Sequence, residues 1–171
     1  MEGSGRSVFV HYRKGNGMQA SGELMTLIHE QAPDAVIFAD RDGVIRAWNR
    51  SASILFGYEA NEALSQSLDL IIPEQFREAH WTGYDRALKA GETKYSGKSL
   101  PTRSQRKVGS TIYVELSFAI IHDGSGEVIG ALAHARDITE RWAQDREQRR
   151  RLRDLEETVK QLNPGAEHVS R

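Results

Sequence analysis

The sequence predicts an α+β domain: a five-stranded antiparallel sheet covered by a helical insert, with an amphipathic helix before it and a coiled-coil helix after it. Three observations carry this prediction. Two β-rich runs separated by a tight turn come first, short helical patterns follow, and three further β-like runs complete the order. Because strands joined by such short connections run antiparallel, the runs are expected to close one antiparallel sheet.

The first elements follow from spacing and from breaking residues. Residues 1–22 are rich in glycine and are interpreted as a flexible leader or a non-native remnant. Apolar residues recur at helical spacing over Glu23–Gln31, and Pro33 ends that helix, since the residue before a proline avoids helical dihedrals. The runs Ala35–Asp40 and Val44–Asn49 are separated by a glycine turn, so they are predicted to form a hairpin.

The insert consists of short helices followed by one long helix. Residues Ser51–Leu64 fit short helical turns interrupted by Gly57. A longer helix is predicted to begin at Pro73, which suits a first turn, and to end at Gly91. This helix carries His80.

The second half of the sheet is predicted as strands over Lys94–Arg106, Ser110–His122 and Val128–Ile138. One face of the last strand presents only small side chains, which leaves volume inside the sheet. These are Ala131, Ala133 and Ala135.

The C-terminal segment predicts a helix over Thr139–Leu162 that ends in a coiled coil. Four apolar residues follow one another at spacings of 3, 4 and 3, as in a heptad seam, namely Leu152, Leu155, Val159 and Leu162. A two-stranded coiled coil is therefore expected from Leu152 to Leu162. Asp145 and Gln148 occupy the same seam and weaken its middle, and residues 163–171 are interpreted as a tail.

Composition excludes several classes of function. The chain carries 23 basic and 24 acidic residues, and its net charge of -1 gives no field that would recruit nucleic acid. There is no cysteine, and no apolar run approaches the about 18 residues of a spanning helix, so no membrane span and a cytoplasmic protein are expected. Neither a paired acid/base constellation nor a phosphate-binding loop is found, so the chain is not expected to be an enzyme.

Several motifs resemble those of PAS domains, the sensory modules of bacterial signalling proteins. The hairpin matches D-x-x-G-x-I-x-x-W-N, the following helix reads L-F-G-Y, and "RDITERW" over Arg136–Trp142 is similar to the motif that opens a signalling helix. The likeness extends from Leu24 to Arg141. It implies a PAS sensor domain over residues 23–138 and a signalling helix over 139–162.

A narrower resemblance concerns the FixL-type haem PAS oxygen sensors. It rests on "PEQFREAH", the following Arg86, "GE" at positions 91 and 92, and "QRKVGST" over Gln105–Thr111. The "R-x-A-H" of the direct-oxygen-sensor phosphodiesterases also matches here. The resemblance implies that His80 is the proximal iron ligand of haem b (iron protoporphyrin IX) and that Arg86 contacts a propionate. It places further residues at the cofactor, namely Phe76, Tyr84, Tyr95, Leu100, Leu116, Phe118 and Ala133.

The sequence departs from that family on the distal side. Leu100 stands where FixL-type domains have an arginine, and Lys98 stands where the phosphodiesterase sensors have a methionine ligand. Without a charged donor, bound oxygen would lose a hydrogen bond of about 1.5–3 kcal/mol. Weaker oxygen affinity, or a preference for carbon monoxide or nitric oxide, is therefore expected.

The preferred hypothesis is a haem-binding sensor of a diatomic gas that forms a homodimer through its N-terminal helix and its coiled coil. The output signalling domain is expected outside this chain. Two alternatives remain: a PAS domain that binds an organic acid or a flavin, and a ligand-free dimerisation module. A lone histidine on a half-apolar helix is also compatible with an ordinary core or rim residue. His134 is expected to face away from the pocket, and His122 is expected to be exposed.

Overall fold

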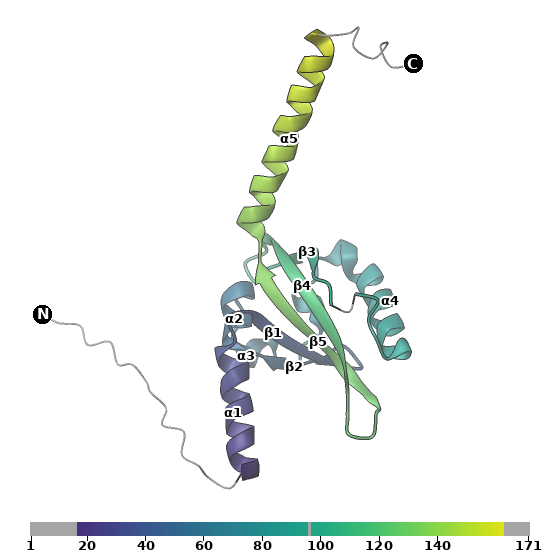
Figure 1. The fold of residues 1–171 in the computed structure, drawn as a ribbon. Coiled ribbons are helices and arrows are strands. Elements are labelled where there is room, and N and C mark those ends of the chain that lie inside the picture. Colours follow the sequence, from purple (N-terminus) through teal and green to yellow (C-terminus); the bar gives the residue numbers. More distant parts are fainter. Residues whose placement is uncertain (1–16, 96, 163–171) are drawn as a thin grey trace, which may run out of the picture.

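The computed structural model describes residues 17–95 and 97–162, and its strands form one antiparallel sheet (Figure 1). The strand order in the sheet is β2-β1-β5-β4-β3. The predicted five-stranded antiparallel sheet is thus confirmed. The strands are β1 (Ala35–Asp40), β2 (Ile45–Trp48), β3 (Leu100–Gln105), β4 (Thr111–His122) and β5 (Val128–Asp137).

Helices precede, interrupt and follow the sheet. Figure 1 shows the last helix running away from the sheet, at the end opposite to the first one, while α4 lies beside β3 and β4. No helix in the described ranges has the length and apolarity needed to cross a bilayer. The helices are α1 (Gly17–Gln31), α2 (Arg50–Phe56), α3 (Ala60–Ala63), the 3-10 helix η1 (Leu68–Leu70), α4 (Glu74–Ala90) and α5 (Thr139–Leu162).

The turn of the first hairpin is built by Asp40 and Gly43. One carboxylate oxygen of Asp40 accepts hydrogen bonds from the backbone of Asp42 and of Val44, both at 3.0 Å. Gly43 takes a φ of 74°, and a Cβ at that position would lie 2.2 Å from the ring of Trp81. The glycine therefore permits both the turn and the close approach of α4.

The core lies between α2, α3 and the face of the sheet that carries Ile37 and Val114, which we call the inner face. The largest of the fully buried side chains are Phe56, Ile45, Ile112, Val114 and Asn49. Asn49 is the polar member of this set. Its side chain accepts hydrogen bonds from the backbone of Val36 and Ala52, and it donates to the carbonyls of His29 and Asp34.

Two element boundaries differ from the prediction by several residues, and one short helix is additional. The first helix begins at Gly17 instead of Glu23, so residues 17–22 are helical, while residues 1–16 lie outside the described ranges. The third strand begins at Leu100 instead of Lys94, because its pairing with β4 begins at Leu116 and the residues before it form turns. The short helix η1 was not predicted.

The last strand leads directly into α5. The backbone N–H of Ile138 donates to the carbonyl of Tyr113 at 2.9 Å, and the hydroxyl of Thr139 accepts from the N–H of Tyr113 at 3.0 Å. The side chain of Asp137 accepts from the N–H of Thr139 at 2.8 Å and caps the helix start. The predicted helix over Thr139–Leu162 is confirmed, whereas the coiled coil stays a prediction.

Candidate ligand site

His80 lies on α4 with its ring half-buried. The Nε2 atom of the imidazole is buried, and no described residue forms a hydrogen bond with it. Burial lowers the pKa of the imidazole below its ordinary value, and the negative charge of Asp69 opposes this shift only in part. The ring is therefore neutral at pH 7, with one nitrogen that the protein itself leaves unsatisfied.

Two aromatic residues hold the His80 ring in place. The ring of Trp81 meets it edge-on at a centroid distance of 5.0 Å, and the ring of Tyr84 stacks on it at 5.8 Å. The indole N–H of Trp81 donates to a carboxylate oxygen of Asp69 at 2.9 Å. These contacts fix the orientation of the imidazole without using its Nε2 atom.

Tyr84 anchors α4 to the end of β1. Its hydroxyl donates to the carbonyl of Asp40 at 2.7 Å, with the carbonyl of Ala39 at 3.1 Å. Burial, together with the nearby charge of Asp40, raises the pKa of the phenol to about 12. Tyr84 therefore stays a protonated donor, and its role in this structure is to position the helix that carries His80.

Part of the inner face is incompletely covered. Leu100, Leu116, Phe118 and Ala133 are each half-buried, and we call these four residues the sheet wall. The register places them together: Leu100 pairs with Leu116, and Phe118 pairs with Ala133.

Helix α4 covers this part of the sheet only loosely. None of its residues is fully buried, whereas the inner-face neighbours Ala35 and Val114 are 2% and 0% exposed. The apolar surface of the sheet wall therefore stays partly accessible. Of the residues that the resemblance implied for the pocket wall, Leu116, Phe118 and Ala133 share this face, whereas Tyr95 lies outside the strands.

Three other predicted site residues, namely Phe76, Arg86 and Tyr95, are exposed or contact residues other than His80. Phe76 is 38% exposed, and its ring faces the guanidinium of Arg103 on β3 at 5.5 Å. Arg86 is exposed on α4. Tyr95 is half-buried and lies in the turns before β3, not in a strand, with the ammonium group of Lys94 at 4.7 Å from its ring centroid.

The other histidines weighed from the sequence lie elsewhere. His134 is exposed, and its register partners Val36 and Ser117 belong to the opposite face of the sheet, as expected. His122 is exposed beside the β4–β5 turn, which also agrees with the prediction. In the described ranges, no three or more histidine, aspartate or glutamate side chains gather where a metal ion could be held. Haem ligation would need only one histidine.

Asp69 is the site residue that sequence reasoning missed. Besides accepting from Trp81, it lies 3.7 Å from the guanidinium of Arg77, and it is the charge that acts on the His80 pKa. Arg77 also donates to the carbonyls of Asp69 and Ile72. The sequence offered no signal for this cluster, because it depends on the position of η1 beside α4.

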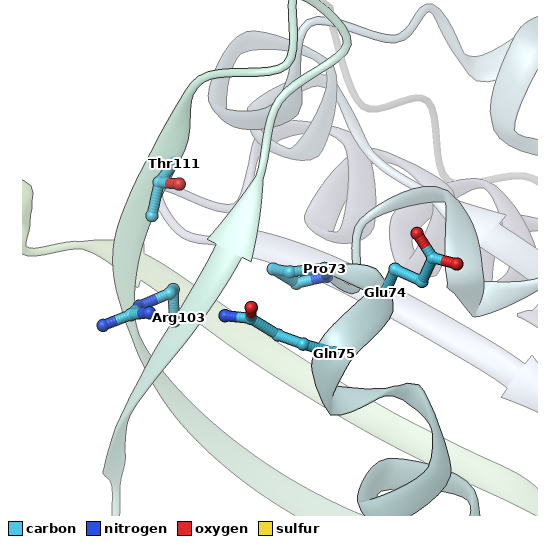
Figure 2. Close-up of a pocket in the computed structure, with 5 residues that line it drawn as sticks. All are labelled: Pro73, Glu74, Gln75, Arg103 and Thr111. Carbon is cyan, nitrogen blue, oxygen red and sulfur yellow. The ribbon is translucent and has the colours of Figure 1, made fainter.

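Two surface cavities have linings that do not include His80, although Asp69 lines the second of them. One, of about 460 Å³, lies between the start of α4 and the β3–β4 pair, as Figure 2 shows; it is lined by Pro73, Glu74, Gln75, Arg103 and Thr111. The other, of about 330 Å³, is lined by Tyr58, Gln66, Ser67, Asp69, Leu70, Arg77 and Gln105. The first lining is largely polar and the second is mixed, so neither cavity is the apolar slot that the resemblance implies.

A family model described as the PAS fold matches residues 29–143. Two known structures resemble the fold. A PAS domain from Colwellia psychrerythraea gives a TM-score of 0.61 at 22% identity, covering 70% of this chain and 98% of that one. A PAS domain from Burkholderia thailandensis in complex with ethanol gives 0.51 at 12% identity, covering 66% and 96%. At such identities these structures support the fold alone.

Three curated relatives are similar over most of this chain. The sensor protein FixL of Bradyrhizobium diazoefficiens is 27% identical over 68% of the chain. The oxygen sensor protein DosP and the signal transduction histidine-protein kinase AtoS, both of Escherichia coli, are 28% and 30% identical over 78% and 86%. The matches span only 23%, 16% and 23% of the lengths of these three proteins.

Proposed function

The chain belongs to the PAS-fold family, and from that premise we propose that it senses a diatomic gas through haem b ligated by His80. The orphaned Nε2 atom of His80 carries the proposal. A buried polar atom without a partner costs free energy, so such atoms are rare unless a ligand or an ion satisfies them. A neutral imidazole on a helix, with one nitrogen free, is the group that ligates haem iron.

The sheet wall and Arg86 suit the apolar and acidic parts of such a group. The half-buried sheet wall offers apolar surface for a flat macrocycle, and the small side chain of Ala133 leaves volume there. Arg86 is exposed one and a half turns after His80, where a basic side chain suits an acidic group at the rim. When bound, haem would supply an iron with an open position for a gas.

The chain's own residues would determine which gas is preferred. Leu100 lies on the sheet wall in register with Leu116, so the position at which the resemblance implies an arginine donor carries an aliphatic side chain. An aliphatic wall excludes water and donates no hydrogen bond to oxygen. The protein would therefore favour carbon monoxide or nitric oxide more than a sensor with a charged donor does.

Two of the relatives support this proposal, and one of the similar structures supports an alternative. FixL is named a sensor protein and DosP an oxygen sensor protein, whereas AtoS is named only as a signalling histidine kinase. A PAS domain that binds another small molecule, such as an organic acid or a flavin, is the second candidate. The Burkholderia PAS domain in complex with ethanol shows that a small organic guest can be accommodated in this fold.

Absorbance spectra of the purified chain titrated with haemin test the proposal. We expect saturation at about one haem per chain and an intense Soret band that shifts on reduction and again on adding carbon monoxide. Flavin bands in the protein as purified would establish the second candidate instead. A colourless protein that takes up no haemin would exclude haem sensing and leave an interaction module.

We also propose that α5 pairs with the same helix of a second copy. The four seam residues Leu152, Leu155, Val159 and Leu162 are 59%, 61%, 63% and 80% exposed, so a heptad seam stands open to solvent. The seam places leucine at d positions and the β-branched Val159 at an a position, which favours two parallel strands. In that register Arg151 faces Glu156 of the second copy, with opposite charges. Exposed apolar residues on α1, namely Leu24, Met25 and Ile28, would extend the same interface.

The Leu155→Lys variant is expected to weaken the dimer by at least about 100-fold, because two leucines lose about 3 kcal/mol or more of burial. Sedimentation equilibrium over a range of micromolar concentrations measures this dissociation constant. Glu157→Lys is the matched control, since it introduces the same side chain two residues later, outside the seam. A wild-type chain that is monomeric throughout that range, with and without haem and carbon monoxide, contradicts the dimer proposal.

A further inference from the structure

We propose that Arg103 of β3 couples helix α4 to helix α5, by holding a stack of side chains that runs from Phe76 to Trp142. The inference rests on the proposed function for the ligand that acts on α4. The stack itself consists of contacts among described residues. Arg103 is thus a positioning residue for signal transmission and takes no part in binding the ligand.

On the side of α4, Arg103 faces Phe76. Its guanidinium carbon lies 5.5 Å from the centroid of the Phe76 ring, within the range of a cation–π contact. Phe76 precedes His80 by one helical turn, so both residues lie on the same face of the helix. In Figure 2, Arg103 on β3 stands opposite the first turn of α4, across the cavity that Pro73 and Gln75 also line.

On the side of β4, Arg103 faces its register partner Tyr113. The guanidinium carbon lies 5.6 Å from the centroid of the Tyr113 ring, and Nη2 donates to the phenol oxygen at 3.2 Å. Within the described ranges, Arg103 forms no ion pair with a carboxylate, unlike Arg106, which pairs with Asp137. The two aromatic rings are therefore the groups that set the position of its guanidinium.

Tyr113 in turn holds the first turn of α5. Its ring stacks on Trp142 at a centroid distance of 4.8 Å and an interplanar angle of 16°. Its backbone carbonyl and N–H bind Ile138 and Thr139, where the helix begins. Further along α5, Arg149 lies over the ring of Trp142, with its guanidinium carbon 5.6 Å from the ring centroid.

This arrangement gives a displacement of α4 a physical route to α5. When a ligand on His80 shifts the first turns of α4, Phe76 moves relative to β3, and Arg103 cannot keep both of its ring contacts unless Tyr113 follows. Tyr113 carries the start of α5 with it through its ring and its backbone. A planar guanidinium can face two rings at once, and an amide or an aliphatic side chain cannot replace it there.

Hydrogen–deuterium exchange of residues 139–150 tests the coupling. In the haem-loaded ferrous chain, carbon monoxide is expected to change exchange rates in this segment by about fivefold or more. The Arg103→Gln variant should reduce this change to less than about twofold, while its Soret band and carbon monoxide affinity stay those of the wild type. Arg136→Gln, which removes an exposed sheet arginine paired with Asp34, is the matched control and should keep the full response.

A second arm uses the chain without haem, so that it does not depend on the proposed function. Phe76→Ala is expected to change the exchange of residues 139–150 when Arg103 is present and to leave it unchanged in an Arg103→Gln background. If the wild type takes up no haemin, the proposed function fails and this arm alone decides the coupling. A carbon monoxide response retained by Arg103→Gln, or an effect of Phe76→Ala that is absent or independent of Arg103, overturns the inference.

Discussion

The His80→Ala variant is expected to bind haem more weakly than the wild type by more than about 100-fold. Removing a group that only supports a ligating histidine already costs up to about 100-fold in affinity, and this variant removes the ligand itself. The reason is that His80 contributes the one buried, unpartnered imidazole nitrogen on α4. Folding should change by only about 1 kcal/mol, because the ring is half-buried and its Nε2 atom makes no protein hydrogen bond that could be lost. Haemin titration followed at the Soret band, with urea unfolding of the haem-free chain beside it, measures both effects.

His134→Ala provides the matched control for this experiment. His134 is exposed on the opposite face of the sheet, so its removal should leave haem affinity unchanged. Retention of an unchanged Soret band by His80→Ala would show that His80 is not the ligand. Equal losses in both variants would show instead that the site depends on general stability and not on a particular histidine.

Composition alone does not show which histidine is the best candidate ligand. The structure distinguishes the histidines by the groups that surround each imidazole nitrogen. His29 also has a buried Nε2 atom without a hydrogen-bond partner, but its Nδ1 atom lies 3.5 Å from Glu30. It stands near the end of α1, where its carbonyl accepts from Asn49. Among the described histidines, His80 is the one that combines a buried, unpartnered nitrogen with a place on α4, the helix beside β3 and β4 (Figure 1).

The parts of the fold predicted well are those marked by local signals. Gly57 and Gly91 end α2 and α4 in left-handed conformations, with φ values of 81° and 69°, as glycines after apolar helical patterns indicate. The hairpin of β1 and β2 follows from its glycine turn in the same way. Each signal acts within a few residues, so the sequence alone is enough to read it.

The parts predicted poorly depend on residues far apart in the chain. The start of β3 is set by the pairing of Leu100 with Leu116, and Tyr95, a β-favouring residue type, lies before it without a partner strand. Tyr95 was placed in that strand for this reason. A strand ends where its neighbour stops pairing with it, and local propensity does not report this.

In the candidate site, too, the features with a local signal were predicted and those that depend on distant residues were not. The resemblance placed Leu116, Phe118 and Ala133 at one wall, and the register of β4 and β5 puts them on one face, because the strand period fixes which side chains share it. The contact of Phe76 with Arg103 and the cluster around Asp69 were not predicted. Both depend on how α4 and η1 pack against the sheet, which spacing along one element does not determine.

The Asn49→Ala variant is expected to lower the free energy of unfolding by about 3 to 5 kcal/mol. The side-chain oxygen of Asn49 accepts from the N–H groups of Val36 and Ala52, both at 2.9 Å, and the second of these bonds caps α2. Removing the amide leaves both donors unsatisfied in a fully buried position, and each costs about 1–3 kcal/mol. Urea unfolding followed by far-ultraviolet circular dichroism measures the loss.

Loss of the two N–H donors of the Asn49 amide is also expected to affect α1. They bind the carbonyls of His29 and Asp34, at 3.0 and 3.1 Å, so they tie the end of that helix to the first strand. Faster hydrogen exchange over residues 21–31 in the variant is therefore expected below the unfolding transition. Ser51→Ala is the matched control: it removes a single hydrogen bond to the carbonyl of Ala32 and should cost about 1 kcal/mol. An Asn49→Ala chain no less stable than this control would mean that water replaces the amide, and that α1 is held by packing alone.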